Sequence, residues 1–149
     1  MKKYIYMIKQ INEAAERCVN RQMRRFDLTY SQVKVLFVLH MKDAENCSLK
    51  ELEAEIGVAQ QTMAGLVKRL EMKGLVETFP DPKERRAKRV RLTDAGREME
   101  SIVKENIDAV EEALLQGISQ ENVEIMAAVM DRFLANLEEM TAGEVKADE

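Results

Sequence analysis

The apolar positions between residues 48 and 93 change their spacing part way along the segment. Two stripes at helical intervals come first. They comprise Leu49, Leu52 and Ile56, and then Met63, Leu66, Val67 and Leu70. From Arg89 to Leu92, polar and apolar residues alternate with period two, as in a half-buried strand. This order predicts two short helices followed by strand structure.

Local signals mark where these helices begin and end. Ser48 and Glu51 form the S-x-x-E pattern of a capping box. Gly57 stands where a left-handed residue often ends a helix. A second helix is predicted over residues 60–73, with Gly74 as its stop. Two short helices joined by a glycine-containing turn are typical of helix-turn-helix DNA-binding proteins.

A strongly basic loop follows the second helix. Segments 75–79 and 89–92 predict two strands, and the turn-forming Pro80, Asp81 and Pro82 begin their connection. Residues 83–91 contain six basic side chains and one acidic one. An isolated basic run is commonly a solvated surface, but this one lies between two strands directly after a helix-turn-helix. We therefore predict a β-hairpin wing that contacts DNA.

The second helix supplies candidate base contacts. Recognition helices place their N-terminal residues against base edges, and here these are Gln60, Gln61 and Thr62. Glutamine can pair with adenine, and threonine can bond a base or touch a thymine methyl. Lys68 and Arg69 suit phosphate contacts. This helix alone also fits an ordinary surface helix with a polar face, and the adjacent wing favours DNA.

Long helices are predicted on both sides of this segment. Apolar residues at alternating intervals of three and four follow residues 3–25 and 119–141, which is coiled-coil spacing. Residues 29–41 are nearly all apolar from Val33 onwards, which predicts a helix buried on several sides. Residues 93–117 carry another apolar stripe. Because so much of the terminal helix is apolar, we expect a dimer interface; packing within one chain is the alternative.

Composition narrows the class of protein. The chain has 149 residues, a net charge of −4, two separated cysteines and one histidine. Neither a metal site nor a disulfide scaffold is expected from these residues. No apolar run reaches the length of a membrane span and the N-terminus lacks signal-peptide features, so a cytoplasmic location is expected. No nucleophile–base pair or phosphate loop indicates an enzyme, and no cofactor is expected.

Charge is distributed unevenly along the chain. Residues 1–97 contain 20 basic and 13 acidic side chains, whereas residues 98–149 contain 3 and 14. The basic part includes the wing. The negative total charge therefore does not exclude a nucleic-acid partner.

Two segments carry a family resemblance, LVKRLEMKGLVE at 66–77 and DPKERRAKRVRLTDAGRE at 81–98. The second closely matches the wing signature of the multiple-antibiotic-resistance regulator (MarR) family. In that signature an aspartate–arginine segment leads into a strand ending Leu-Thr and then a helix with an early glycine. The order of elements extends the resemblance over nearly the whole chain. It implies a homodimeric repressor that binds a pseudo-palindromic operator in double-stranded DNA and is released by a small anionic or phenolic effector.

The resemblance also implies roles for single residues. Arg86 would enter the minor groove, while Asp81 and Arg85 would brace the wing. Arg17 and His40 would line an effector cleft. The DNA-binding residues expected in total are Ser48, Gln60, Gln61, Thr62, Lys68, Arg69, Asp81, Lys83, Arg85, Arg86, Lys88 and Arg89.

Three positions depart from the family pattern. Glu84 stands where aspartate is usual, and Ala59 replaces the usual N-cap serine, a change of roughly 1 kcal/mol in helix stability. Gly65 stands where many members have a larger, often basic, residue. The base preference of other members therefore cannot be carried over to this chain.

We therefore expect a mainly α fold with a small β-hairpin wing, in a single subunit of residues 1–142. Residues 28–97 would form the winged helix-turn-helix DNA-binding lobe, residues 3–25 and 98–141 a helical dimerisation lobe, and residues 142–149 a flexible tail. Two alternatives remain within DNA binding: a sequence-independent architectural protein, and a regulator that responds to oxidation of Cys18 or Cys47. A coiled-coil interaction module would explain the seams but not the wing.

Overall fold

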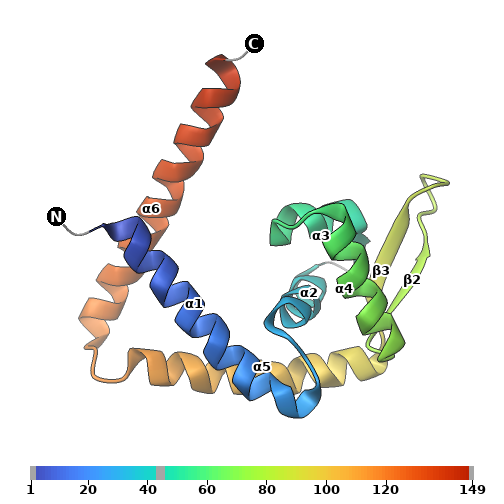
Figure 1. The fold of residues 1–149 in the computed structure, drawn as a ribbon, viewed down its shortest axis with the longest axis horizontal. Helices are drawn as coiled ribbons and strands as arrows, with labels where there is room; N and C mark the ends of the chain where they lie inside the picture. The colour runs from blue at the N-terminus through green and yellow to red at the C-terminus, as the bar shows by residue number, and fades with distance from the viewer. Residues whose placement is uncertain (1–2, 43–45, 148–149) are drawn as a thin grey trace. The chain divides into compact units, whose positions relative to one another are not determined.

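The computed structural model describes residues 3–42 and 46–147 of a mainly helical chain (Figure 1). The chain divides into two compact units, residues 1–110 and residues 111–149. Its elements in order are α1 (Tyr4–Met23), the 3-10 helix η1 (Arg24–Phe26), α2 (Tyr30–Met41), β1 (Asn46–Ser48), α3 (Leu49–Ile56), α4 (Gln60–Met72), β2 (Val76–Pro80), β3 (Lys88–Leu92), α5 (Asp94–Leu115) and α6 (Gln120–Ala147).

Capping residues near each helix explain where several of these elements begin. Thr29 and Gln32 form a capping box at α2, and Ser48 and Glu51 form one at α3. Each box satisfies two backbone donors that the first turn of a helix leaves without partners. Gly57 follows α3 in the left-handed conformation, at φ 73°. The expected helix-turn-helix is thereby confirmed as α3, a short turn and α4.

The first unit contains a small antiparallel sheet in the order β1-β3-β2. In the β2–β3 hairpin Val76 pairs with Leu92 and Pro80 pairs with Lys88, which confirms the predicted wing strands. β1 was not predicted, because residues 42–47 have the composition of a polar loop. Asn46 and Cys47 instead pair with Arg91 and Val90 of β3. The remaining loop residues, 43–45, lie outside the described part of the chain.

The core of the first unit gathers around α2. Val35, Leu36 and Leu39 of this helix are fully buried, together with Leu52 of α3 and Met63 of α4. This confirms that the nearly continuous apolar run from Val33 belongs to a helix covered on several sides. The core therefore fixes α3, α4 and the sheet around one buried helix and leaves the polar face of α4 exposed.

The second unit consists of the end of α5 and the whole of α6. A flexible tail was expected from residue 142, but α6 continues to Ala147. The segment after Thr141 has no proline, and the single Gly143 lowers helix stability by only about 1 kcal/mol. Residues 148 and 149 lie outside the described residues. Throughout residues 3–42 and 46–147, every helix is too short or too polar to cross a lipid bilayer.

Apolar side chains remain exposed along α6. They are between 39% and 65% exposed, and they are Ile125, Val129, Met130, Phe133, Leu134, Leu137 and Met140. α1 has a comparable exposed group in Tyr4, Ile5, Tyr6, Met7, Ile8 and Ile11. These helices therefore present the apolar seams predicted from their spacing to solvent in the single chain.

Candidate nucleic-acid interface

The recognition helix α4 divides into a buried face and an exposed face. Met63, Leu66, Val67 and Leu70 form the buried face. The exposed side chains include Gln60, Gln61, Thr62, Lys68 and Arg69. Ala59 at the N-cap gives no side-chain cap bond, so the first turn of α4 begins without one. The polar residues expected to contact DNA thus lie outside the core.

Ser48 at the start of α3 has a structural role in the free chain. Its backbone N–H donates to Oε2 of Glu51 at 2.6 Å, and its Oγ accepts from the backbone N–H of Glu51 at 3.1 Å. The first of these bonds is the main reason that the pKa of Glu51 is lowered from 4.5. Lys50, two residues after Ser48, is exposed, and it was not among the expected DNA contacts. The sequence feature that could have identified Lys50 as a candidate is a basic side chain in the first turn of α3.

The wing tip is a compact turn with exposed cations. The backbone N–H of Asp81 donates to the carbonyl of Ala87, and that of Ala87 donates to Glu84, each at 3.0 Å. The Asp81 carboxylate accepts from the backbone N–H of Lys83 at 2.8 Å, which is the largest cause of its lowered pKa. Lys83, Arg85, Arg86 and Lys88 are exposed. The wing therefore presents three cations on a hydrogen-bonded loop and a fourth, Lys88, at the start of β3.

Arg89 differs from these cations because it is largely enclosed by other side chains. Its Nε donates to Oδ1 of Asn46 at 2.9 Å, and its Nη1 lies 3.4 Å from Oδ2 of Asp81. Its Nη2 lies 3.8 Å from Oε2 of Glu51. The resemblance implied that Arg85 would brace the wing with Asp81; in the structure Arg89 contacts Asp81. Asn46 was not among the expected site residues, because no local sequence pattern connects it to Arg89.

Two further contacts join the wing strands to each other and to α4. Arg91 pairs with Glu77 at 2.6 Å and lies over the Phe79 ring, 4.8 Å from its centroid. The Glu71 carboxylate in α4 accepts from the hydroxyl and the backbone N–H of Thr78, at 2.8 Å and 3.1 Å. These bonds lower the pKa of Glu71. The base of the wing is thus held to the recognition helix.

The wing and the helix-turn-helix enclose a cleft of about 360 Å³. The structure brings six of the expected DNA-binding residues together around it: Ser48, Gln60, Asp81, Arg86, Lys88 and Arg89. Gln61, Thr62, Lys68, Lys83 and Arg85 do not line this cleft, and Arg69 lines a different one. Half of the expected residues therefore share one cleft, in which Gln60 of α4 and Arg86 of the wing both take part.

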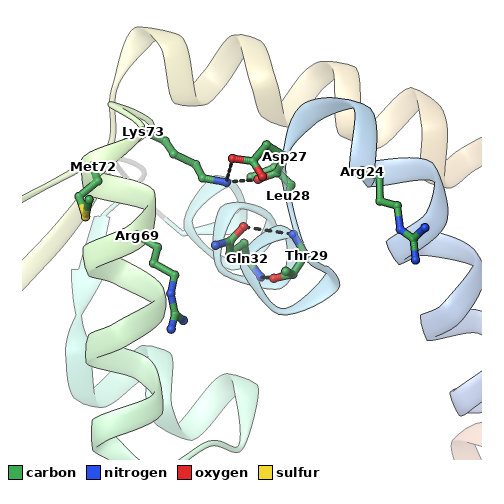
Figure 2. A pocket seen from close by; sticks show the side chains of 8 residues that line it. All are labelled: Arg24, Asp27, Leu28, Thr29, Gln32, Arg69, Met72 and Lys73. Atoms are coloured by element: carbon green, nitrogen blue, oxygen red, sulfur yellow. Dashed lines mark hydrogen bonds and ion pairs between the residues drawn. The ribbon is translucent and has the colours of Figure 1, made fainter.

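A second cavity of about 570 Å³ lies between the α1–α2 connection and the end of α4 (Figure 2). Lys73 reaches across it to Asp27, with 3.1 Å between Nζ and Oδ2. Arg69 and Arg24 come from opposite walls, and the buried Gln32 lies between them. An adjoining cavity is lined by Arg17, Arg21 and Arg24. Arginines from α1 and η1 are therefore gathered near the N-terminal end of α2.

The two expected effector contacts are not brought together. Arg17 shares its cavity with Thr29 at the beginning of α2. His40 lies near the other end of this helix, about 16 Å further along at 1.5 Å per residue. Its Nδ1 lies 3.5 Å from Oε2 of Glu100, a buried residue of α5. A single small ligand between Arg17 and His40 is therefore not favoured by this geometry.

The cysteines occupy different environments. Cys47 in β1 is buried, and this burial raises the pKa of its thiol from 9.0 to about 11. Cys18 in α1 is exposed. Within the described residues, no group of three or more histidine, cysteine, aspartate or glutamate side chains is arranged to hold a metal ion. The environment of Cys47 disfavours the thiolate that oxidation requires.

The helix-turn-helix part of the chain is similar to a known protein family. A model of the MarR family matches residues 26–87. The HTH-type transcriptional regulator YybA of Bacillus subtilis (strain 168), itself uncharacterized, is 25% identical over 131 residues, covering 88% of this chain and 86% of YybA.

Solved structures share the fold over most of the chain. MepR of S. aureus, in a complex with DNA, gives a TM-score of 0.83 at 22% identity over 91% of this chain and 99% of that chain. BpsR of Bordetella bronchiseptica, whose DNA binding is regulated by 6-hydroxynicotinic acid, gives 0.79 at 19% identity over 89% and 98%.

The chain therefore has the winged-helix fold of these solved structures. The family match covers α2, the helix-turn-helix, β2 and the wing loop, and it includes all the candidate DNA-binding residues except Lys88 and Arg89 of β3. The chain is thus similar to MarR-family transcriptional regulators in the sequence of residues 26–87, and it shares the fold of solved MarR-family structures over about nine-tenths of its length.

Proposed function

We propose that the protein acts in the cytoplasm as a homodimeric repressor that binds a pseudo-palindromic operator and is released by a small anionic effector. Each subunit would insert α4 into a major groove and the wing into the adjacent minor groove. The two half-sites would then lie about one helical turn, roughly 34 Å, apart. Residues 28–97 would be the DNA-binding lobe, with residues 3–25 and 98–141 responsible for dimerisation.

The observation that carries the proposal is the cleft shared by α4 and the wing. Gln60 at the start of α4 and Arg86 in the wing line the same cleft. A glutamine can recognise an adenine in the major groove, whereas an arginine suits a narrow minor groove. Lys68 and Arg69 would contact phosphates and set the register. One surface therefore offers contacts for two adjacent grooves.

The exposed apolar side chains of α1 and α6 support dimerisation. Leu134 and Leu137 are 59% and 52% exposed, and Ile5 of α1 is 78% exposed. Leaving such side chains in water forgoes about 25 cal/mol for each Å² of apolar surface that could be buried. A second copy would cover these seams, which repeat at coiled-coil spacing.

The arginine cavities near α2 support an anionic effector. Arg17, Arg21 and Arg24 line one cavity, and Arg24 and Arg69 line the adjoining one. Guanidinium groups suit carboxylates and phosphates. BpsR, which shares the fold, is regulated by 6-hydroxynicotinic acid. Such an effector would release DNA only if it binds the DNA-free conformation more tightly than the DNA-bound one.

The decisive experiment is a salt titration of binding to the DNA upstream of the protein's own coding region. Scrambled DNA of equal length is the control. We expect tight, sequence-selective binding whose logarithm falls steeply with the logarithm of salt concentration. Small aromatic and aliphatic anions can then be added to the bound complex to find a compound that dissociates it.

Three other results would each contradict a part of this proposal. Equal, weak binding to both DNAs would contradict a specific operator in this region and favour an architectural DNA-binding protein. Absence of binding to either DNA at low salt would contradict the assignment of α4 and the wing. A protein that stays monomeric at micromolar concentration would contradict the dimer.

A further inference from the structure

Arg89 connects three segments of the winged helix that are distant in sequence. Its Nε donates to Asn46 of β1 at 2.9 Å, and its two terminal nitrogens lie 3.4 Å from Asp81 and 3.8 Å from Glu51. These partners belong to the sheet edge, the start of the wing loop and the first turn of α3. The guanidinium fork has donors in three directions in one plane, so it can bridge all of them.

The network is more enclosed than the rest of the wing. The side chain of Arg89 is 26% exposed and that of Asp81 is 13% exposed. The neighbouring Arg91 is 50% exposed, although it lies on the same strand. A charge pair with less access to water is screened less by salt, so this network resists disruption better than an exposed pair does.

The network also lies beside the candidate DNA contacts. Arg89, Asp81 and Glu51 line the same cleft as Gln60 and Arg86. Arg86 is three residues before Arg89 on the wing, and Gln60 begins the recognition helix. A contact that fixes the wing loop against α3 would therefore also fix the spacing between the candidate minor-groove residue Arg86 and the candidate major-groove residue Gln60.

We propose that Arg89 is a positioning residue: by holding Asp81 of the wing to Asn46 and Glu51, it sets where Arg86 lies relative to α4. This assignment replaces the expectation that Arg89 itself contacts DNA, because its donors are already directed at protein acceptors. It rests on the proposed function for the role of Arg86. It does not depend on which operator the protein recognises.

The first test measures the wing in the absence of DNA. Spin labels are attached at Lys50→Cys and Lys83→Cys in a Cys18→Ser background, and the distance between them is measured by pulsed electron resonance. We expect the distance distribution to broaden in Arg89→Met and to stay narrow in Arg91→Met, which removes the same charge from the same strand. An unchanged distribution in Arg89→Met overturns the proposal.

The second test asks whether removing a negative charge from the wing raises or lowers the affinity for DNA. Asp81→Asn and Glu84→Gln each remove one negative charge from the wing, and Coulomb attraction alone would make both bind DNA more tightly. Positioning predicts that Asp81→Asn binds more weakly, by about tenfold, while Glu84→Gln binds as tightly as the wild type or more tightly. Tighter binding by Asp81→Asn overturns the proposal.

A double-mutant cycle with Arg86→Ala separates the role of Arg89 in positioning the wing from the role of Arg86 in binding DNA. If Arg89 acts through Arg86, then Arg89→Met weakens operator binding about tenfold in the wild type and less than about twofold in Arg86→Ala. If the losses of affinity caused by the two substitutions multiply fully in the double variant, Arg89 contacts DNA independently of Arg86. If Arg86→Ala alone binds like the wild type, the proposed wing contact fails, and the spin-label result still decides whether Arg89 positions the wing.

Discussion

The carbonyl oxygen of Leu75 occupies the place where a Cβ atom would stand on Gly96. Leu75 lies between α4 and β2, and Gly96 lies in the first turn of α5. The same carbonyl accepts a hydrogen bond from the backbone N–H of Thr93 at 3.1 Å, and the Thr93 hydroxyl donates to the carbonyl of Gly74 at 2.6 Å. The close approach of the Leu75 and Gly96 backbones fixes the start of α5 against the segment that follows the recognition helix.

Gly96→Ala should therefore destabilise the protein by about 1–3 kcal/mol, since backbone must move to admit the methyl group. Gly65→Ala is the matched control, because its nearest atom is Nη1 of Arg69 at 3.8 Å, a flexible side-chain end. That change should stabilise α4 by about 1 kcal/mol. Urea unfolding of both variants measures the two effects, and equal stability of Gly96→Ala and the wild type would contradict the packing described above.

Arg86→Ala should weaken operator binding strongly and lower the salt slope by about 1, since one phosphate-region cation is lost. Fluorescence anisotropy over a range of salt concentrations measures both quantities. Lys104→Ala removes one positive charge from α5, where Lys104 pairs with Asp108, and should change neither. Wild-type affinity in Arg86→Ala would show that the wing arginine does not contact the operator.

Leu137→Glu should convert the proposed dimer to a monomer, because it places a charge in the apolar seam of α6. Leu137 is already exposed in the single chain, so the folded monomer should survive the change. Ala128→Glu adds the same charge on the opposite face of the helix and should remain dimeric. Sizing with light scattering distinguishes these outcomes, and a dimeric Leu137→Glu would place the interface elsewhere.

Cys47 should be inert towards thiol reagents in the folded protein. With a pKa raised to about 11 by burial, its thiolate fraction at pH 7 is on the order of 10⁻⁴. In a Cys18→Ser variant, reaction with a chromogenic disulfide should accelerate at least about a hundredfold on unfolding in urea. Rapid reaction of the folded variant would instead support a regulator that responds to oxidation.

The link between Glu71 and Thr78 predicts a pH-dependent contribution to stability. The pKa of Glu71 is lowered from 4.5, first by the Thr78 hydroxyl and then by the Thr78 backbone N–H. A carboxyl whose pKa is lower in the folded state stabilises the protein above its unfolded pKa, and this contribution is lost as pH falls through the folded pKa. Thr78→Val should raise the pKa of Glu71, measured by NMR titration.

The same substitution gives a stability test with a defined sign. The difference in unfolding free energy between the wild type and Thr78→Val should be constant near pH 7 and should shrink as pH falls below about 4. A difference that stays constant from pH 7 to pH 3 would contradict a role for the ionised carboxylate.

The elements that could be predicted depend on residues near each other in sequence. Two helix starts are indicated by capping pairs, Thr29 with Gln32 and Ser48 with Glu51, because each pair lies within one turn. Gly57 and Gly74 mark helix ends by their positive φ. The apolar intervals of α4 predicted its buried face for the same local reason.

β1 and the Arg89 network could not be predicted in this way. Asn46 pairs with Arg91, 45 positions away, and nothing in residues 42–47 distinguishes a strand from a polar loop. The period-two pattern of β3 directs Arg89 away from the core, but it says nothing about the acceptors that surround it there. The end of α6 was also missed, since its composition resembles a solvated tail.

The sequence by itself determined the order of the helices, the helix-turn-helix and the basic hairpin, because these follow from periodicity and capping over a few residues. Only the tertiary structure decided which wing cations stay exposed and which one is enclosed. Arg86 and Arg89 have the same chemistry and lie three positions apart, yet only Arg89 meets Asn46, Asp81 and Glu51. That difference depends on bringing β1, α3 and the wing together, which the packing around α2 makes possible.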